Sequence, residues 1–171
     1  MNFQRSLNST EEEFISPLET SDYIDPTIED FLLTDLKDKD LKLDVARELN
    51  VTYLGETNEE PSLPVNGIIW GINRRPLLNL IVGRGSSQIN VIFLVNPSSP
   101  NSFVSSEVVK ALKIDVGRAF FVDIHGKNAF VNLSSNHFKD VNILGAEYIQ
   151  RRRLAVTFDY DDLTFTMSTK N

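Results

Sequence analysis

The stretch Asn142–Asp159, with the sequence NILGAEYIQRRRLAVTFD, decides the fold of this chain. It opens on two apolar residues and a glycine, Ile143, Leu144 and Gly145, and continues into a short segment compatible with a helix. Beyond the arginines, apolar and polar residues alternate, which is typical of a β-strand. The stretch therefore predicts a short helix followed directly by a strand.

The composition fits one compact domain with an appendage, since the chain has 171 residues and 41% of them are apolar. Cysteine is absent, which excludes disulfides, cysteine nucleophiles and thiolate metal sites. The two histidines leave little material for a zinc site, so we expect no metal and no cofactor. No apolar run is long enough to span a membrane, and residues 1–10 lack the apolar core of a signal peptide. We expect a soluble, cytoplasmic protein that does not act at a membrane.

Charge divides the chain into two parts. Residues 1–65 carry 16 acidic and 5 basic side chains, whereas residues 66–171 carry 8 acidic and 12 basic ones. Either the acidic part is a solvated arm, or it folds back onto, or competes for, a basic surface of the rest. We predict a disordered acidic tail, a helical extension, a linker and a β domain, with the boundaries 1–24, 25–54, 55–65 and 66–171.

Two short amphipathic helices are predicted in the extension. Asp25-Pro26 supplies a helix start, and a second segment places Leu41, Val45 and Leu49 on one face. These apolar stripes must be covered, either by the β domain or by another protein. The candidate partner-binding side chains of the first helix are Ile28, Phe31, Leu32 and Leu36.

Strand patterns dominate after the linker, and they indicate a mostly antiparallel β barrel with two small helices. Ser105 is a candidate cap for a helix over Ser106–Leu112, and His125-Gly126-Lys127-Asn128 is a natural hairpin turn. The predicted strands are Gly67–Ile72, Leu77–Val82, Ile89–Val95, Ala119–Ile124, Ala129–Leu133 and Leu163–Met167.

The order and spacing of these pieces resemble the monomer of a retropepsin-like aspartic protease over residues 75–167. The resemblance implies a mostly β, closed or half barrel and a homodimer built partly from terminal strands. The pieces that carry it are the first strand Arg75–Leu80, the strand Ile92–Val95 into the active-site loop, the strand Phe103–Ser105 leaving it, the hairpin Val122–Leu133 and the closing motif Val141–Ile149.

The loop that should hold the catalytic aspartate is degenerate. Active members of the family have Asp-Thr-Gly or Asp-Ser-Gly where this chain has Asn96, Pro97 and Ser98. Two facing aspartates share one proton and act as base and acid, whereas asparagine has no titratable proton near neutral pH. Pro97 offers neither a hydroxyl nor an N–H, and Ser98 adds a side chain where glycine permits close approach. The resemblance therefore implies a catalytically inactive chain.

The interval after the loop is also short. Only 49 positions separate Asn96 from Gly145. Retroviral proteases use a longer interval because it contains a flap that closes over the substrate and excludes water. Residues 114–118 leave almost no room for such a flap, which removes a substrate clamp as well as the chemistry.

These observations favour a non-catalytic module of retroelement lineage that dimerises and binds a protein or peptide as a scaffold or adaptor. Strand edges or the N-terminal helices would make the contact. An active but divergent endopeptidase stays open, with Asp115 as its nearest candidate acid. So does an unrelated small β domain.

A third alternative is a nucleic-acid adaptor that uses Arg151, Arg152 and Arg153, with the pair Arg74-Arg75. The chain is acidic overall and its aromatic residues do not alternate with these arginines, so we expect no nucleic-acid partner. The three arginines are then a candidate surface for the acidic arm, an acidic partner or a dimer.

Overall fold

A computed structural model describes residues 33–115 and 117–170. The predicted mostly β architecture is confirmed in this part of the chain, which also contains a few short helices. The strands are β1 (Val65–Trp70), β2 (Arg75–Arg84), β3 (Ser87–Val95), β4 (Ser102–Val104), β5 (Ala119–Ile124), β6 (Lys127–Leu133), β7 (Asn142–Leu144), β8 (Leu154–Asp159) and β9 (Thr164–Thr169).

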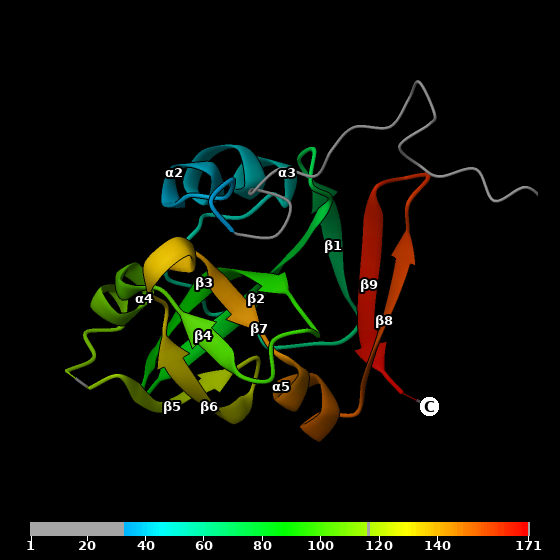
Figure 1. The fold of residues 1–171 in the computed structure, drawn as a ribbon. Coiled ribbons are helices and arrows are strands. Elements are labelled where there is room, and N and C mark those ends of the chain that lie inside the picture. Colours follow the sequence, from blue (N-terminus) through cyan, green and yellow to red (C-terminus); the bar gives the residue numbers. More distant parts are fainter. Residues whose placement is uncertain (1–32, 116, 171) are drawn as a thin grey trace, which may run out of the picture.

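Six of these strands close a barrel (Figure 1). The order of neighbours is β3, β7, β4, β6, β5 and β2, and the ring closes because β2 also pairs with β3. β3 pairs in parallel with β7, as β4 does with β6, whereas the hairpins β2–β3 and β5–β6 are antiparallel. The prediction of a mostly antiparallel barrel is therefore correct, with β3–β7 and β4–β6 as the two parallel exceptions.

An arm of three strands leaves the barrel at β2. β1 pairs with β2 on one side and with β9 on the other, and β8 pairs with β9. Figure 1 shows this arm beside the barrel, with α5 (Ala146–Arg151) at its base. Gly67 lies directly over the buried ring of Phe165, where a Cβ atom would stand 2.3 Å from Cε1 of that ring, so β1 and β9 can pack this closely only around a glycine.

The extension is part of the same hydrophobic core. α2 (Asp38–Asp40), a π-helical turn (Leu41–Val45) and α3 (Ala46–Glu48) form one run of helical residues, which lies across one end of the barrel (Figure 1). Leu41 and Val45 are fully buried, as the predicted apolar face requires. The alternative that the β domain covers this stripe therefore applies to the described part of the extension.

Leu36 must be withdrawn from the candidate partner surface. Its side chain is 1% exposed and belongs to the core cluster, so it offers nothing to a separate protein. Ile28, Phe31 and Leu32 lie outside the described residues.

Local predictions in the β region hold closely. The helix expected at 106–112 is α4 (Ser106–Ala111), although the Ser105 side chain makes no capping hydrogen bond. The β5–β6 turn is shorter than expected, because Ile124 pairs with Lys127 and leaves two turn residues, His125 and Gly126, both with positive φ. No helix in the described residues is long and apolar enough to cross a membrane.

Candidate functional site

The degenerate loop begins where β3 ends. β3 and β7 are paired from Phe93 opposite Asn142 to Val95 opposite Leu144. The N–H of Asn96 continues this ladder by donating to the carbonyl of Leu144 at 3.0 Å. The loop and the closing motif, which the sequence places 49 positions apart, are therefore direct neighbours.

The loop folds into a compact turn. The Asn96 side-chain oxygen accepts a hydrogen bond from the Ser98 N–H at 3.1 Å, and the Asn96 carbonyl accepts one from the Ser99 N–H at 3.0 Å. Pro97 lies between Asn96 and Ser98 in this turn, beyond the end of β3, where its lack of an N–H costs no hydrogen bond of the strand. Asn96 is half-buried and its side-chain oxygen supports the turn.

Gly145 joins the loop to α5. The carbonyls of Ser99 and Pro100 accept hydrogen bonds from Ala146 and Glu147, the first residues of the helix, at 2.8 and 3.1 Å. A Cβ at Gly145 would lie 2.2 Å from the carbonyl oxygen of Asn101, so only glycine permits this approach. The glycine of the closing motif has a packing role that the sequence alone did not reveal.

A cavity of 480 Å³ opens beside the loop. Its wall combines residues from the loop with residues of the N-terminal segment, β2, β4, the 3₁₀ turn Asn136–Phe138 and β7. The ring of Phe138 contacts Phe103 edge-on at 5.1 Å. The lining residues are Leu33, Arg75, Asn96, Ser98, Ser99, Phe103, His137, Phe138 and Ile143. Within the described residues, this cavity has no carboxylate in its lining.

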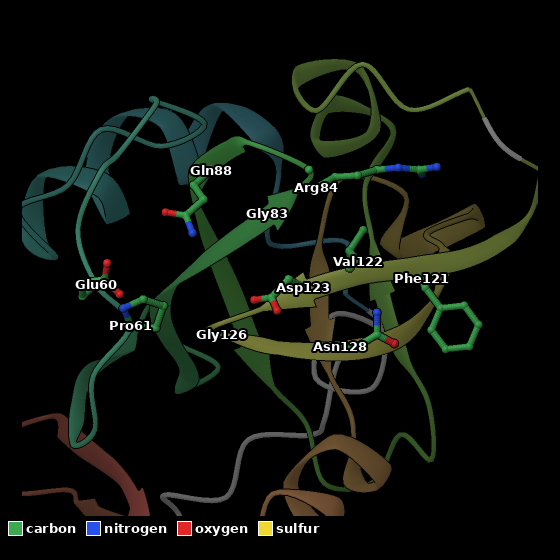
Figure 2. A pocket seen from close by; sticks show the side chains of 11 residues that line it. Glu60, Pro61, Gly83, Arg84, Gln88, Phe121, Val122, Asp123, Gly126 and Asn128 are labelled. Carbon is green, nitrogen blue, oxygen red and sulfur yellow. The ribbon is translucent and has the colours of Figure 1, made fainter.

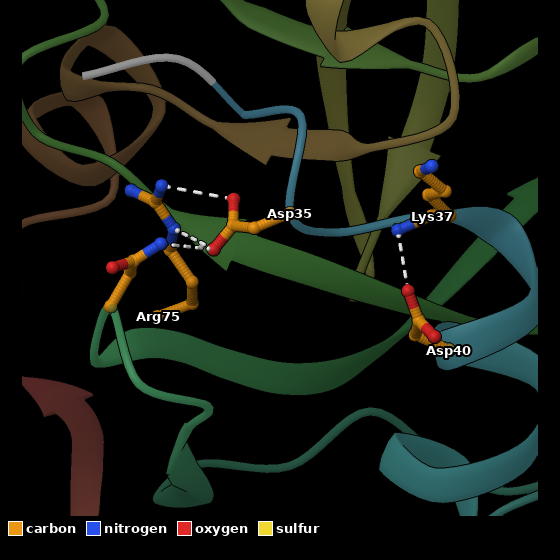
Figure 3. Close-up of polar contacts among 5 residues, drawn as sticks. Asp35, Lys37, Asp40 and Arg75 are labelled. Carbon is orange, nitrogen blue, oxygen red and sulfur yellow. Dashed lines mark hydrogen bonds and ion pairs between the residues drawn. The ribbon is translucent and has the colours of Figure 1, made fainter. Parts of the chain in front are cut away.

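Arg75, which lines the cavity, is itself paired with a carboxylate, that of Asp35 (Figure 3). Asp35 accepts two hydrogen bonds from Arg75, each at 3.0 Å, and one from Asn73 at 2.9 Å. Burial alone would raise the pKa of Asp35, but the hydrogen bonds from Arg75 and Asn73 and the Arg75 charge outweigh it and hold the pKa below its ordinary value. A carboxylate held in this way is a weak base, so Asp35 is poorly suited to activate water.

A second asparagine, Asn142 at the start of β7, was not singled out by the sequence. Asn142 is fully buried, and its side-chain oxygen accepts the Ser105 N–H at 2.8 Å. Its amide donates to the Tyr53 hydroxyl and to the Ile92 carbonyl, both at 2.9 Å. Burial raises the pKa of Tyr53 to about 12. Asn142 therefore ties β7 to β3, to the start of α4 and to the extension.

The three arginines of the candidate basic surface have different surroundings. Arg151 pairs with Glu147 at 2.8 Å, and the guanidinium of Arg152 lies over the Tyr148 ring at 5.8 Å. Arg153 is exposed beyond the end of α5. Taken together with the described part of the extension and the linker, the β domain has no net charge, since residues 33–171 carry 16 acidic and 16 basic side chains.

The remaining sequence candidates are not assembled at the loop. Asp115 is exposed after α4 and does not line the cavity beside Asn96. No group of three or more His, Cys, Asp or Glu side chains that could hold a metal occurs in the described residues. The arrangement beside Asn96 can accommodate a ligand with polar and apolar parts, and its described lining residues include no pair of carboxylates.

One solved structure with a similar fold is the crystal structure of a retropepsin-like aspartic protease from Rickettsia conorii, at 14% sequence identity and a TM-score of 0.44. The match covers 66% of this chain and 97% of that chain. No protein-family model matches this sequence, and no curated protein matches it.

Proposed function

We propose that this chain is a non-catalytic module with a retropepsin-like barrel, which dimerises and binds protein. The single observation that carries the proposal is the loop at Asn96, whose side chain supports its own turn beside a cavity without a lining carboxylate in the described residues. Aspartic protease chemistry needs one carboxylate to take a proton from water while another donates one. An amide can do neither near neutral pH.

The proposal predicts no peptidase activity from the full chain. A peptide library would be incubated with the protein between about pH 3.5 and 6, where a carboxylate pair shares its proton, and cleavage would be followed by mass spectrometry. The expected result equals the buffer control, with and without pepstatin. Cleavage that pepstatin stops would contradict the proposal and favour the divergent endopeptidase.

The dimerisation part of the proposal is supported by β8. This strand pairs with β9 and with no other strand of the described chain, so its outer backbone edge is open. Phe158 and Tyr160 are stacked at 5.8 Å at the exposed end of the arm, and they are 37% and 62% exposed. An open edge next to an exposed aromatic pair suits a second copy of this chain.

Solution mass tests this part. Sedimentation of the full chain over a range of concentrations should give a dimer, and Phe158→Lys should shift the equilibrium to the monomer by placing a charge in the aromatic pair. The matched control is Thr157→Lys, which adds the same charge at the next position on the opposite face of β8. A wild-type monomer at every concentration, or equal effects of the two variants, would remove dimerisation through β8 from the proposal.

A further inference from the structure

The outer edge of β5 is a second open edge, away from the arm. β5 pairs with β6 along its whole length, from Ala119 to Ile124. On its other side it pairs with β2 at Asp123 and Ile124 alone. Residues 119–122 therefore have no strand beside them on that side in the described part of the chain.

The hydrogen-bond pattern between β5 and β6 shows which backbone groups of β5 point to this open side. Ile124 closes the two-residue turn, so hydrogen bonds to β6 come from every second residue counted back from it. The residues in between face β2, in agreement with the His125 N–H, which donates to the Ile81 carbonyl at 2.6 Å. The N–H and C=O groups of Ala119 and Phe121 consequently point to the side that lacks a partner strand.

This edge borders a hollow of 380 Å³ between the β2–β3 and β5–β6 hairpins (Figure 2). Phe121 is 60% exposed, and its ring lies 5.1 Å from that of its cross-strand neighbour Phe130, which is 48% exposed. Arg84 lines the same end of the hollow and is exposed; no ion pair holds it within the described residues. Figure 2 shows Glu60 at the opposite end, with Asp123 between the two.

We infer that this edge binds an extended peptide, which adds to β5 as a further strand and places an apolar residue over Phe121 and a carboxylate toward Arg84. The unpaired backbone groups select a peptide, because their donors and acceptors match those of another strand. The two phenylalanines supply apolar contact area. Glu60 and Asp123 line the hollow and would repel a polyphosphate chain.

This inference rests on the protein-binding part of the proposed function and gives it a place and a ligand class. It does not depend on dimerisation through β8. A chain that dimerises but binds no peptide at β5 would lose this inference and keep the dimerisation part of the proposed function.

Selection from a display library of random twelve-residue peptides against the full-length protein provides the probe. The enriched peptides should carry an acidic residue close to an apolar one, and one synthetic copy would be used for the measurements. Amide hydrogen exchange followed by NMR should show that the peptide slows exchange at Ala119 and Phe121, whose N–H groups have no partner strand among the described residues. N-methylation of alternate peptide amides should weaken binding by about tenfold or more while leaving every side chain in place.

A charge reversal tests whether the carboxylate of the peptide lies near Arg84. Arg84→Glu should weaken binding of the acidic peptide by about tenfold, and a peptide with lysine in place of the acidic residue should recover part of the loss. Lys127→Glu is the matched control, because it makes the same change on exposed β6 at the turn end of the hairpin and should leave the affinity unchanged. No enriched peptide, protection at other amides, or equal effects of the two reversals would overturn the inference.

Discussion

Two asparagines, Asn142 and Asn96, lie at opposite ends of the short ladder between β3 and β7, and they differ in burial and in the hydrogen bonds of their side chains. Asn142 opens β7, is fully buried and makes three side-chain hydrogen bonds to other parts of the fold. Asn96 follows β3, is half-buried, and its side chain accepts one hydrogen bond from its own turn. In the sequence both are polar residues next to apolar strands. They differ in burial and in hydrogen-bond partners, so we expect the position that the family resemblance assigns to catalysis to contribute little to the stability.

The largest loss of stability is expected when Asn142 is replaced. Asn142→Ala would leave the Ser105 N–H buried without its partner and would remove the side-chain hydrogen bonds to Tyr53 and Ile92, which costs about 3 kcal/mol of unfolding free energy in total. That is a large share of the stability of an ordinary domain. Urea unfolding followed by circular dichroism measures it. Asn128→Ala, at an exposed position on β6, is the control and should change little. A loss below about 1 kcal/mol at Asn142 would show that the site relaxes and that the two asparagines do not differ in this way.

A smaller loss of stability is expected at the ion pair between Asp35 in the extension and Arg75 in the cavity wall. Asp35→Asn removes the charge that pairs with Arg75, whose side chain is 12% exposed, and should cost about 2 kcal/mol. The exposed pair of Asp44 and Arg47 is the control, and Asp44→Asn should have little effect. Equal losses in the two variants would mean that the extension is not held at Asp35.

The same pair has a pH signature. Because the folded pKa of Asp35 is lowered, its contribution is complete above the ordinary carboxyl pKa of about 4 and is lost as pH falls through the lowered value. The stability difference between wild type and Asp35→Asn should therefore shrink as pH falls below roughly 4, as unfolding curves at several pH values would show.

Replacing Tyr53 tests one of the three hydrogen bonds of the Asn142 side chain separately. Tyr53→Phe removes the hydroxyl that accepts the Asn142 amide and should cost about 1 kcal/mol near neutral pH. Burial raises the pKa of Tyr53 to about 12 in the fold, so the neutral form contributes stability that is lost between about pH 10 and 12. The variant should lose less stability than wild type over that range. Identical alkaline unfolding of both proteins would place the titration elsewhere.

Much of the β architecture could be predicted because its signals are local. The alternation in β8, the apolar run of β3 and the turn at His125-Gly126 each depend on neighbouring residues. The sequence also singled out the three arginines that follow the closing motif, Arg151–Arg153. Their separate engagements, Arg151 with Glu147 and Arg152 with Tyr148, depend on side-chain geometry that spacing does not specify.

The long-range contacts were not predictable in the same way. Asn142 meets Tyr53 across 89 positions, and Arg75 meets Asp35 across 40. No local pattern marks either pair, since a polar residue at a strand end is equally suited to solvent. The prediction of Leu36 as a partner surface failed for this reason, because an apolar stripe shows that a face must be covered but not by what.

The smallest effect is expected at Asn96. Asn96→Asp keeps a side-chain oxygen that can accept the Ser98 N–H, so the free energy of unfolding should change by no more than about 0.5 kcal/mol. The variant should also stay without peptidase activity in the same library digest, because Pro97 and Ser98 still differ from the family pattern and the interval to Gly145 stays short. Pepstatin-sensitive cleavage by this variant would show that one amide alone disables the loop. The barrel would then retain the geometry of a protease, and Pro97, Ser98 and the short interval would not be what prevents catalysis.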